Sequence, residues 1–553
     1  MPRNYVSKRP QKTRTVPVST PAPYKGLNTV DSLADMDPAY GLSIQNFIAT
    51  PQGLSVREGY RVWATGLPGD VTTMMPYHAA NSANSKLFAA SVSGFYDVTS
   101  GGAVGAAVVS GLNASNPYWQ YATQTASTAG KSYLMCVNGA DSPRLYDGTS
   151  WTTATQVASP STPGQFSTVD NNGASVSIQN FVDVTLHQQR LWFVANNTTK
   201  AYYTDIAQAS GQLYAFDFGP LFPRGGKLQK LAAWSVNMGS VSGVQSNLVA
   251  FSDKGDCVIF VGNNPASATN WSLSAVYLLG APVGRRCTID FQSDLLYLSR
   301  DGLYPLSQYI QSSTLNNTDA ITTKISPTIG DLTQTFGSSP GFEMALYPGA
   351  NVMLLNIPQA STGSNFQFCF NTVTNGWTQF TGWPAACWGL FNNSLFFGAP
   401  SQVCLAFIGY ADGADITGAG GNNIIATALG AFDFMADKPG LGRGVLKHVH
   451  QVKPYIVTGT VNPTIRVGVN TDFTLVPIVG SATVNPVTGA VWDNAKWDDP
   501  AATWVGSLTT YNQWTTPKCY AGDALAFAMS ISATSQTLWA GTGWIVEPGG
   551  QWG

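Results

Sequence analysis

The near absence of glutamate is the feature that most constrains how this chain can fold. Of its 30 acidic residues only Glu58, Glu343 and Glu547 are glutamates, which leaves 27 aspartates in 553 residues. Glutamate is a good helix former on exposed faces, whereas aspartate is favoured in turns and caps. With 56 Gly, 32 Pro and 12% aromatic residues, the composition predicts a turn-rich, all-β fold. A helical bundle, a coiled coil and a parallel α/β fold are excluded.

One hairpin unit repeats along the chain from about residue 70. It consists of a short apolar strand, a Gly, Asn or Asp turn, a second strand with aromatic residues, and a polar loop. The copies begin roughly 40 to 60 residues apart, which is typical of four-stranded propeller blades. A chain of irregular sandwiches is the structural alternative. The copies are Lys86–Val98, Ser132–Trp151, Arg190–Thr204, Asn247–Gly262, Asp294–Leu306, Val352–Trp377 and Ser394–Tyr410.

Composition shifts divide the chain into four predicted regions. Residues 1–23 form a basic, extended N-terminal arm, and residues 24–411 form an irregular β-propeller with N-terminal strands closing it. Residues 412–423 are a Gly-rich linker, and residues 424–553 form a β-sandwich-like domain with longer alternating strands. Only Gly226–Trp234 has a briefly helical pattern.

Aromatic residues follow several of the repeated hairpins. Trp151, Trp271, Trp377 and Trp383 occupy such positions. We expect an outer strand to pack these rings between neighbouring blades.

The formal net charge of −2 conceals a basic arm on an acidic body. Arg3, Lys8, Arg9, Lys12 and Arg14 fall in the first fourteen residues, which contain no acid. The remaining 23 basic and 30 acidic residues give the rest of the chain a charge of about −7. Such an arm is either a solvated terminus or a segment that orders on a neighbouring subunit or on nucleic acid.

The sequence identifies no catalytic, cofactor-binding or metal-binding residue, and we expect a protein that is not an enzyme. Most aspartates lie in Asp-Gly type turns, which explains them without catalysis. Ser252–Gly255 faintly resembles the Asp-box turn of sialidase propellers. His448 and His450 would lie on one strand face about 7 Å apart. A third metal ligand is not recognisable from the sequence.

The cysteines and the hydropathy pattern bear on the compartment. Seven scattered cysteines without a C-x-x-C pair predict buried thiols in a reducing compartment. No apolar run approaches the length of a membrane span. Because no apolar stretch follows the basic N-terminus, we expect no signal peptide. We expect synthesis in a cytoplasm.

One N-terminal segment carries a family resemblance. Pro23–Trp63 resembles the opening segment of tail nozzle proteins (tail tubular protein B) of short-tailed bacteriophages, in which a Gly- and Asn-containing motif and then a Gly- and Arg-containing motif precede a β-propeller. Phe432–Val457 is similar to the strand that follows the propeller in that family, loosened here by Met435 and by the inserted Gly440–Gly444. The matching N-terminal positions are Gly26, Leu27, Asn28, Pro38, Asn46, Gly53, Arg57, Gly59 and Tyr60, with Gln45 where the family often has alanine.

The resemblance implies a structural virion protein of a short phage tail. Six copies would form a ring, the nozzle, that continues the DNA channel below the portal and its adaptor and conducts or retains genomic DNA. The implied partners are copies of the chain, the adaptor or portal-side ring, tail fibres or spikes, and genomic DNA that passes without sequence specificity. Assembly would take place in the bacterial host cytoplasm.

Two other classes of protein stay open. One is a carbohydrate-binding or glycan-hydrolysing β-propeller at a tail tip, supported by the aromatic residues and the Asp-Gly turns. The other is a host intracellular scaffold propeller, although the Gly-His and Trp-Asp signals of WD repeats are missing. Glycan binding and hydrolysis assays would separate the first class from a nozzle.

Overall fold

The computed structural model describes residues 15–125, 131–237, 244–311, 320–438, 440–459, 463–476, 482–483, 509–511, 513–517 and 521–551. The chain forms two compact units. The ring unit consists of residues 59–370 and 380–422. The sandwich unit consists of the chain up to residue 58, residues 371–379 and residues 423–553. Both units are built almost entirely from strands, so the predicted all-β class is confirmed.

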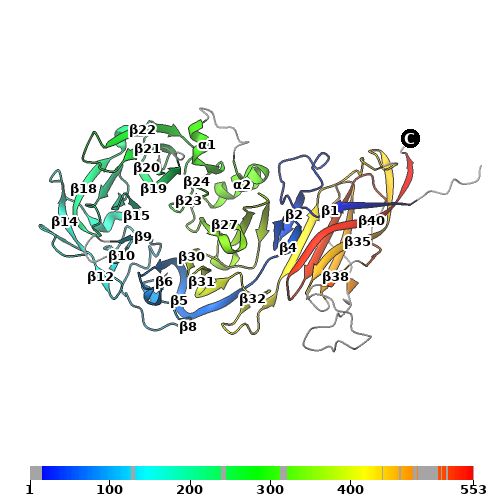
Figure 1. Ribbon diagram of the computed structural model, residues 1–553, viewed down its shortest axis with the longest axis horizontal. Helices are drawn as coiled ribbons and strands as arrows, with labels where there is room; N and C mark the ends of the chain where they lie inside the picture. Colours follow the sequence, from blue (N-terminus) through cyan, green and yellow to red (C-terminus); the bar gives the residue numbers. More distant parts are fainter. Residues whose placement is uncertain are drawn as a thin grey trace, which may run out of the picture. The chain divides into compact units, whose positions relative to one another are not determined.

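The ring unit is a β-propeller. Within the described residues its strands pair in seven groups, here called blades one to seven in chain order, which follow one another around a ring (Figure 1), and one long strand is shared by blades one and seven. The first strand of each blade contacts the neighbouring blades, so these strands surround the axis. They are the second half of β5 (Tyr60–Tyr77), β9 (Gln120–Thr125), β15 (Phe181–His187), β19 (Leu228–Asn237), β23 (Thr288–Phe291), β26 (Glu343–Tyr347) and β30 (Cys387–Phe391).

The outer strands complete each blade by antiparallel pairing. Blade three is extended by two further strands, β14 (Gln165–Asp170) and β13 (Thr155–Val157), which join in parallel. The other outer strands are β6 (Lys86–Ser91) and β7 (Gly94–Asp97); β10 (Ser132–Val137), β11 (Arg144–Tyr146) and β12 (Trp151–Thr153); β16 (Arg190–Ala195), β17 (Lys200–Tyr203) and β18 (Gly211–Asp217); β20 (Val244–Ser252), β21 (Asp256–Gly262) and β22 (Trp271–Leu278); β24 (Asp294–Ser299) and β25 (Gly302–Pro305); β27 (Val352–Ile357) and β28 (Phe366–Asn371); and β31 (Ser394–Ala406).

A single long strand closes the ring. The first half of β5 pairs with β31 of blade seven, with Tyr60 opposite Ala406. Its second half pairs with β6 of blade one, with Tyr77 opposite Lys86. The ring is therefore held shut by backbone hydrogen bonds from residues at the start of the unit to residues near its end.

The hydrophobic cores lie between blades, as the repeated aromatic positions predicted. Trp151 of β12 packs against Phe88 and Phe95 of blade one, with ring centroids 5.0 Å apart in both pairs. Trp271 of β22 stacks on Trp192 of blade three at 5.8 Å. Trp383 stacks on Phe397 of blade seven at 5.7 Å, whereas Trp377 belongs to the sandwich unit. The predicted role between blades holds for Trp151 and Trp271.

The sandwich unit packs two sheets face to face. Phe527 lies between them, with its ring 5.4 Å from Trp539 and 5.9 Å from Trp544. One sheet has the order β3 (Phe47–Thr50), β4 (Gly53–Val56), β40 (Thr537–Gln551), β35 (Val445–Thr458) and β38 (Thr509–Tyr511), with β1 (Val16–Pro21) also on β40. The other has the order β29 (Trp377–Phe380), β2 (Gly41–Gln45), β34 (Ile425–Gly430), β39 (Leu525–Ser532), β36 (Thr464–Thr471) and β37 (Ala482–Thr483).

The N-terminal region differs from the prediction of an extended arm over residues 1–23. Val16–Pro21 is strand β1 and pairs with β40, with Val16 opposite Val546. Thr20 Oγ1 also accepts a hydrogen bond of 2.9 Å from Trp544 Nε1. Prolines are tolerated on an edge strand because only one side of that strand needs backbone donors. Residues 1–14, with the five basic side chains, lie outside the described residues.

The unit boundaries also differ from the predicted ones. Residues 24–58 belong to the sandwich unit, and the ring unit begins at Gly59 instead of residue 24. The predicted linker over residues 412–423 contains strands β32 (Ala411–Ala414) and β33 (Asn422–Asn423). Its turn is fixed by the Asp415 carboxylate, which accepts hydrogen bonds from the amides of Thr417 and Ala419 at 2.9 Å. The glycines of residues 412–423 therefore lie in turns between paired strands and do not form a flexible linker.

The predicted helical segment Gly226–Trp234 is instead part of β19. The strand carries a register shift between Leu228 and Lys230 where it pairs with β20. Leu228, Leu231 and Trp234 are all buried at a spacing of three residues that imitates a helix, and the irregularity accounts for the first of these two spacings. The helices of the ring unit, α1 (Leu306–Gln311) and α2 (Ser326–Phe336), were not predicted.

Candidate functional site

Turn residues that resembled a sialidase Asp-box serve the β20–β21 hairpin. Ser252 Oγ accepts hydrogen bonds from the amides of Lys254 and Asp256 at 3.2 and 2.9 Å. Asp253 accepts one from the Lys227 amide at 2.9 Å. These contacts fix the chain reversal, so the segment is explained by turn chemistry.

The two histidines of β35 lie together but pair with an acid. The rings of His448 and His450 are 4.9 Å apart, and His450 Nε2 lies 2.6 Å from Glu547 Oε2 on β40. A group of three side chains suited to a metal ion is not found in the part of the chain that the structure describes. The two histidines thus have the Glu547 carboxylate beside them, which pairs with His450.

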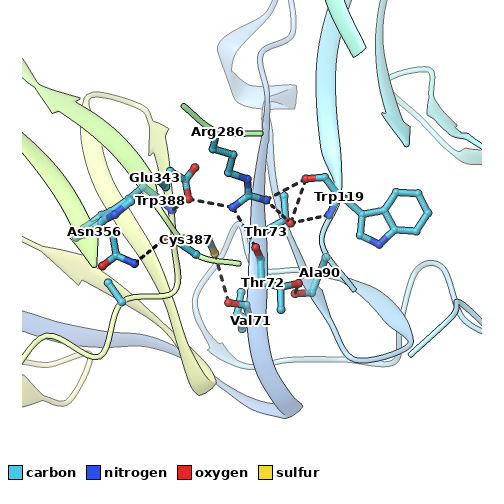
Figure 2. A network of polar contacts seen from close by, with 12 residues as sticks. Val71, Thr72, Thr73, Ala90, Trp119, Arg286, Glu343, Asn356, Cys387 and Trp388 are labelled. Carbon is cyan, nitrogen blue, oxygen red and sulfur yellow. Dashed lines mark hydrogen bonds and ion pairs between the residues drawn. The ribbon is translucent and has the colours of Figure 1, made fainter. Parts of the chain in front are cut away.

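A buried arginine crosses the axis of the ring unit. Arg286, in the loop before β23, donates from Nη1 to the Thr72 carbonyl at 3.2 Å. Its Nη2 donates to Thr73 Oγ1 at 2.7 Å and to the Trp119 carbonyl at 3.0 Å. Its Nη1 also lies 3.0 Å from Glu343 Oε2 on β26. Figure 2 shows the guanidinium between Glu343 on one side and Thr73 with Trp119 on the other.

These contacts join blades that are not neighbours. Arg286 comes from blade five, whereas Thr73 lies in blade one and Trp119 immediately precedes β9 of blade two. Glu343 begins blade six and accepts a hydrogen bond of 3.2 Å from the Trp388 amide in blade seven. One ion pair thus connects five of the seven blades across the axis. We call Arg286, Glu343, Thr73 and their backbone partners the axial network.

Burial and pairing act in opposite directions on this ion pair. Only 14% of the Arg286 side chain and 17% of the Glu343 side chain are exposed. Burial raises the pKa of Glu343 above its ordinary value, and the opposing effects of Arg286 and the Trp388 amide offset part of that rise. Burial also acts to lower the pKa of Arg286, but the Glu343 charge outweighs it and the net pKa is raised. Arginine therefore stays charged at the axis.

A second buried pair links the remaining blades. Lys230 Nζ of blade four lies 2.9 Å from Asp183 Oδ1 of blade three, and Asp183 is fully buried. Arg285, beside Arg286, donates from Nη1 to the Gln229 carbonyl of blade four at 2.9 Å. Burial lowers the pKa of Arg285, and the nearby Asp183 opposes that shift. With the axial network, these contacts bring all seven blades into one chain of polar interactions.

A cavity of about 460 Å³ opens beside these arginines, at the end of the ring where the innermost strands begin. It is lined by Tyr118, Gln120, Asn196, Gln229 and Arg285, among others. A cavity of this volume falls in the usual range of small-molecule sites. The lining offers hydrogen-bond donors, hydrogen-bond acceptors and the Arg285 cation, and therefore suits the binding of a small polar ligand.

Sequence reasoning did not identify this site. Arg285 and Arg286 are adjacent arginines in a chain that is poor in charge, and Glu343, one of only three glutamates, is the first residue of the apolar strand β26. That scarcity was the available signal. Their meeting depends on contacts such as Arg286 with Thr73, which are 213 residues apart.

The thiols and one histidine are buried elsewhere in the chain. Six cysteines are free and buried, as predicted, and Cys519 lies outside the described residues. His187 at the end of β15 is 2% exposed, and burial lowers its pKa to about 4. Its Nε2 has no hydrogen-bond partner among the described residues.

Comparisons with known proteins identify no relative by sequence. No protein-family model and no curated protein matches the chain. Among solved structures, the extracellular domain of the one-component system BT4673 from B. thetaiotaomicron is 10% identical with a TM-score of 0.37, covering 63% of this chain and 40% of that one.

Two further solved structures were matched. The Cps50 (Swd1) β-propeller domain of Myceliophteria thermophila is 11% identical, with a TM-score of 0.38 and coverage of 63% and 99% of the two chains. YCF48 from Cyanidioschyzon merolae is 12% identical, with a TM-score of 0.34 and coverage of 63% and 98%.

A search for membrane-crossing helices found none of sufficient length and apolarity within the described part of the chain.

Proposed function

We propose that this chain is a structural subunit of a short phage tail. In this proposal copies of the chain, six in the family it resembles, form a nozzle ring that continues the DNA channel below the portal and its adaptor. The chain is not an enzyme in this proposal, and genomic DNA passes the ring without sequence-specific contacts. The resemblance at the N-terminal motif supports the proposal, because the motif residues hold fixed structural positions in the sandwich unit.

One observation carries this proposal furthest. Arg57 is fully buried and donates from Nε to Asn46 Oδ1 at 2.9 Å, and from Nη1 to the Glu58 carbonyl. Asn46 itself has a positive φ of 59° and donates from Nδ2 to the Ile425 carbonyl. Two motif positions that are 11 residues apart in sequence thus form one buried hydrogen-bonded unit in the sandwich unit.

The motif glycines are equally constrained. A Cβ on Gly26, whose φ is +86°, would lie 2.5 Å from the Trp377 backbone nitrogen. A Cβ on Gly53, whose φ is +139°, would lie 2.1 Å from the Trp539 carbonyl oxygen. Only glycine fits at such positions. The resemblance therefore covers residues with structural roles, which supports a shared fold for this segment.

The surface composition agrees with assembly into a larger particle. In the sandwich unit Ile425, Leu475 and Val476 are exposed by 59%, 62% and 51%. Apolar side chains on a low-charge surface favour burial against other subunits. The charge of about −7 on residues 15–553 disfavours retention of DNA, because binding to phosphate relies on basic side chains.

The basic arm provides the test of this proposal. Deleting residues 1–14 leaves β1 in place, so the chain will fold while losing its five basic residues. We expect particles with this deletion to lack the docked ring. The matched control replaces Arg3, Lys8, Arg9, Lys12 and Arg14 by lysine or arginine in exchanged positions and keeps docking. In this proposal the basic arm holds the ring to the adaptor or to a neighbouring subunit, and normal docking of the deleted chain would contradict that role.

The lining of the channel is tested separately. We expect replacement of channel-facing aspartates by lysine to slow DNA ejection, because added cations bind phosphate. Unchanged ejection would argue against an acidic channel.

A further inference from the structure

The charges around the axis of the ring unit do not balance. Lys230 pairs with Asp183 and Arg286 pairs with Glu343. Arg285 has no ion pair within 4.0 Å among the described residues, and its one hydrogen bond there runs to the Gln229 carbonyl. An arginine carries five N–H donors in a planar fork, so most of the donors of Arg285 are unused. One half-buried cation is left over beside the cavity.

The cavity also gathers unpaired polar side chains. The amides of Gln120, Asn196 and Gln229 and the hydroxyl of Tyr118 line it. None of these four side chains has a hydrogen bond to another described residue, and all are half-buried. Burial raises the pKa of the Tyr118 hydroxyl, so this group is a neutral donor and acceptor. Groups that are half-buried without partners cost free energy unless water or a ligand satisfies them.

The groups come from different blades and converge at one end of the ring. Gln120 begins β9, Asn196 follows β16, Gln229 lies on β19, and Arg285 precedes β23. They therefore belong to blades two, three, four and five. Ser115 and Ser338, which are exposed, also line the cavity and leave it open to solvent.

These features specify the chemistry of a ligand. A planar guanidinium with free donors matches a carboxylate in a two-point contact. Neutral amides and a phenol, which both donate and accept, match hydroxyl groups. A volume of about 460 Å³ exceeds what a bare inorganic anion fills and falls in the usual range for small organic ligands. Phe342 and Val182 add an apolar part of the lining.

We propose that the axial cavity of the ring unit binds an acidic sugar, with its carboxylate on Arg285 and its hydroxyls on Gln120, Asn196, Gln229 and Tyr118. The proposal is for binding without reaction. It does not depend on the proposed role in a phage tail, and either can fail without the other.

Titration calorimetry on the full chain with D-glucuronate tests the proposal. D-glucose, which has the ring and hydroxyls without the carboxylate, and inorganic phosphate, which has only the charge, are the ligand controls. We expect glucuronate to bind at least about tenfold more tightly than either control, because both the ion pair and the hydroxyl contacts are required. An oligouronate in a parallel titration distinguishes a free sugar from the end of a glycan chain as the source.

Variants locate the site. Arg285→Gln should weaken glucuronate binding about tenfold or more, and Gln120→Ala should weaken it by a smaller factor. Arg466→Gln on β36, which also removes one positive charge but at an exposed position outside the cavity, should leave binding unchanged. A thermal transition at the wild-type temperature confirms that each variant is folded. If Arg285→Gln fails this check, Gln120→Ala and Asn196→Ala decide.

Three outcomes would overturn the proposal. The first is the absence of heat from glucuronate with the wild-type chain. The second is phosphate or glucose binding as tightly as glucuronate. The third is undiminished glucuronate binding by folded variants at Arg285, or at Gln120 and Asn196 together.

Discussion

Replacing Arg286 by methionine will destabilise the ring unit by about 3–5 kcal/mol, the cost of removing one partner of a buried ion pair. The variant loses four contacts, at 3.2, 2.7, 3.0 and 3.0 Å, to Thr72, Thr73, Trp119 and Glu343. Among the described residues, the Glu343 carboxylate then keeps the Trp388 amide as its one partner while remaining buried. Methionine has a similar length, so most of the loss is electrostatic and not a cavity.

The double variant Arg286→Met, Glu343→Met separates charge from shape. Removing both ions of a buried pair is often close to neutral, so the double variant should recover most of the stability lost in the single variant. Guanidinium unfolding at pH 7, followed by circular dichroism and tryptophan fluorescence, gives both free energies of unfolding. Equal destabilisation of the single and the double variant would refute this account of the axial network. So would a loss below about 1 kcal/mol in Arg286→Met.

The pH dependence has a definite sign. Burial raises the pKa of Glu343, and without Arg286 the opposing charge is gone, so the rise becomes larger. An acid whose folded pKa exceeds its unfolded value stabilises below the unfolded pKa, and this stability is lost as pH rises through the folded pKa. The stability deficit of Arg286→Met should therefore be smaller at pH 5 than at pH 7. A deficit that grows on acidification would contradict the reasoning.

Three further substitutions have expected outcomes that follow from packing, backbone and burial. Burial lowers the pKa of His187 from 6.5 to about 4. The neutral histidine therefore contributes its full stability above pH 6.5, and the free energy of unfolding falls by about 3 kcal/mol as the pH drops to 4. His187→Phe should lose this acid sensitivity in pH-dependent unfolding, and an unchanged profile would contradict the burial argument. Gly26→Ala should cost at least about 2 kcal/mol, measured by denaturant unfolding, because of its positive φ and the close Trp377 backbone; a neutral effect would show that the turn can shift. Trp271→Ala should cost about 3–5 kcal/mol through lost packing between blades three and four, whereas the control Trp514→Ala at a 41% exposed ring should cost far less.

The repetitive part of the fold was predictable from the sequence. Hairpins such as Asn247–Gly262 combine period-two apolar alternation with a turn residue, and both signals are local. Trp151 and Trp271 follow their hairpins at positions where large rings fill the space between blades. The all-β class and the propeller depend on such local signals, which explains why they were readable.

Features set by long-range pairing were not predictable. Strand β1 was read as an arm because Pro17 and Pro21 argue against a strand, and its partner β40 is more than 500 residues away. The irregularity near Leu228 imitated a helix because it shifts the alternation by one residue. The axial network was missed for the same reason, since Arg286 meets Thr73 only after seven blades have closed. Single charged residues acquire such roles through topology, so the scarcity of charge in the sequence marks these residues without showing which residues they contact.

Cryo-electron microscopy of the native particle that contains this chain tests the proposed function most directly. The account predicts a ring of copies around an axial channel beneath a portal and its adaptor. Isolated copies at the tip of a fibre, with the propeller cavity open to solvent, would contradict it and would favour a glycan-binding role.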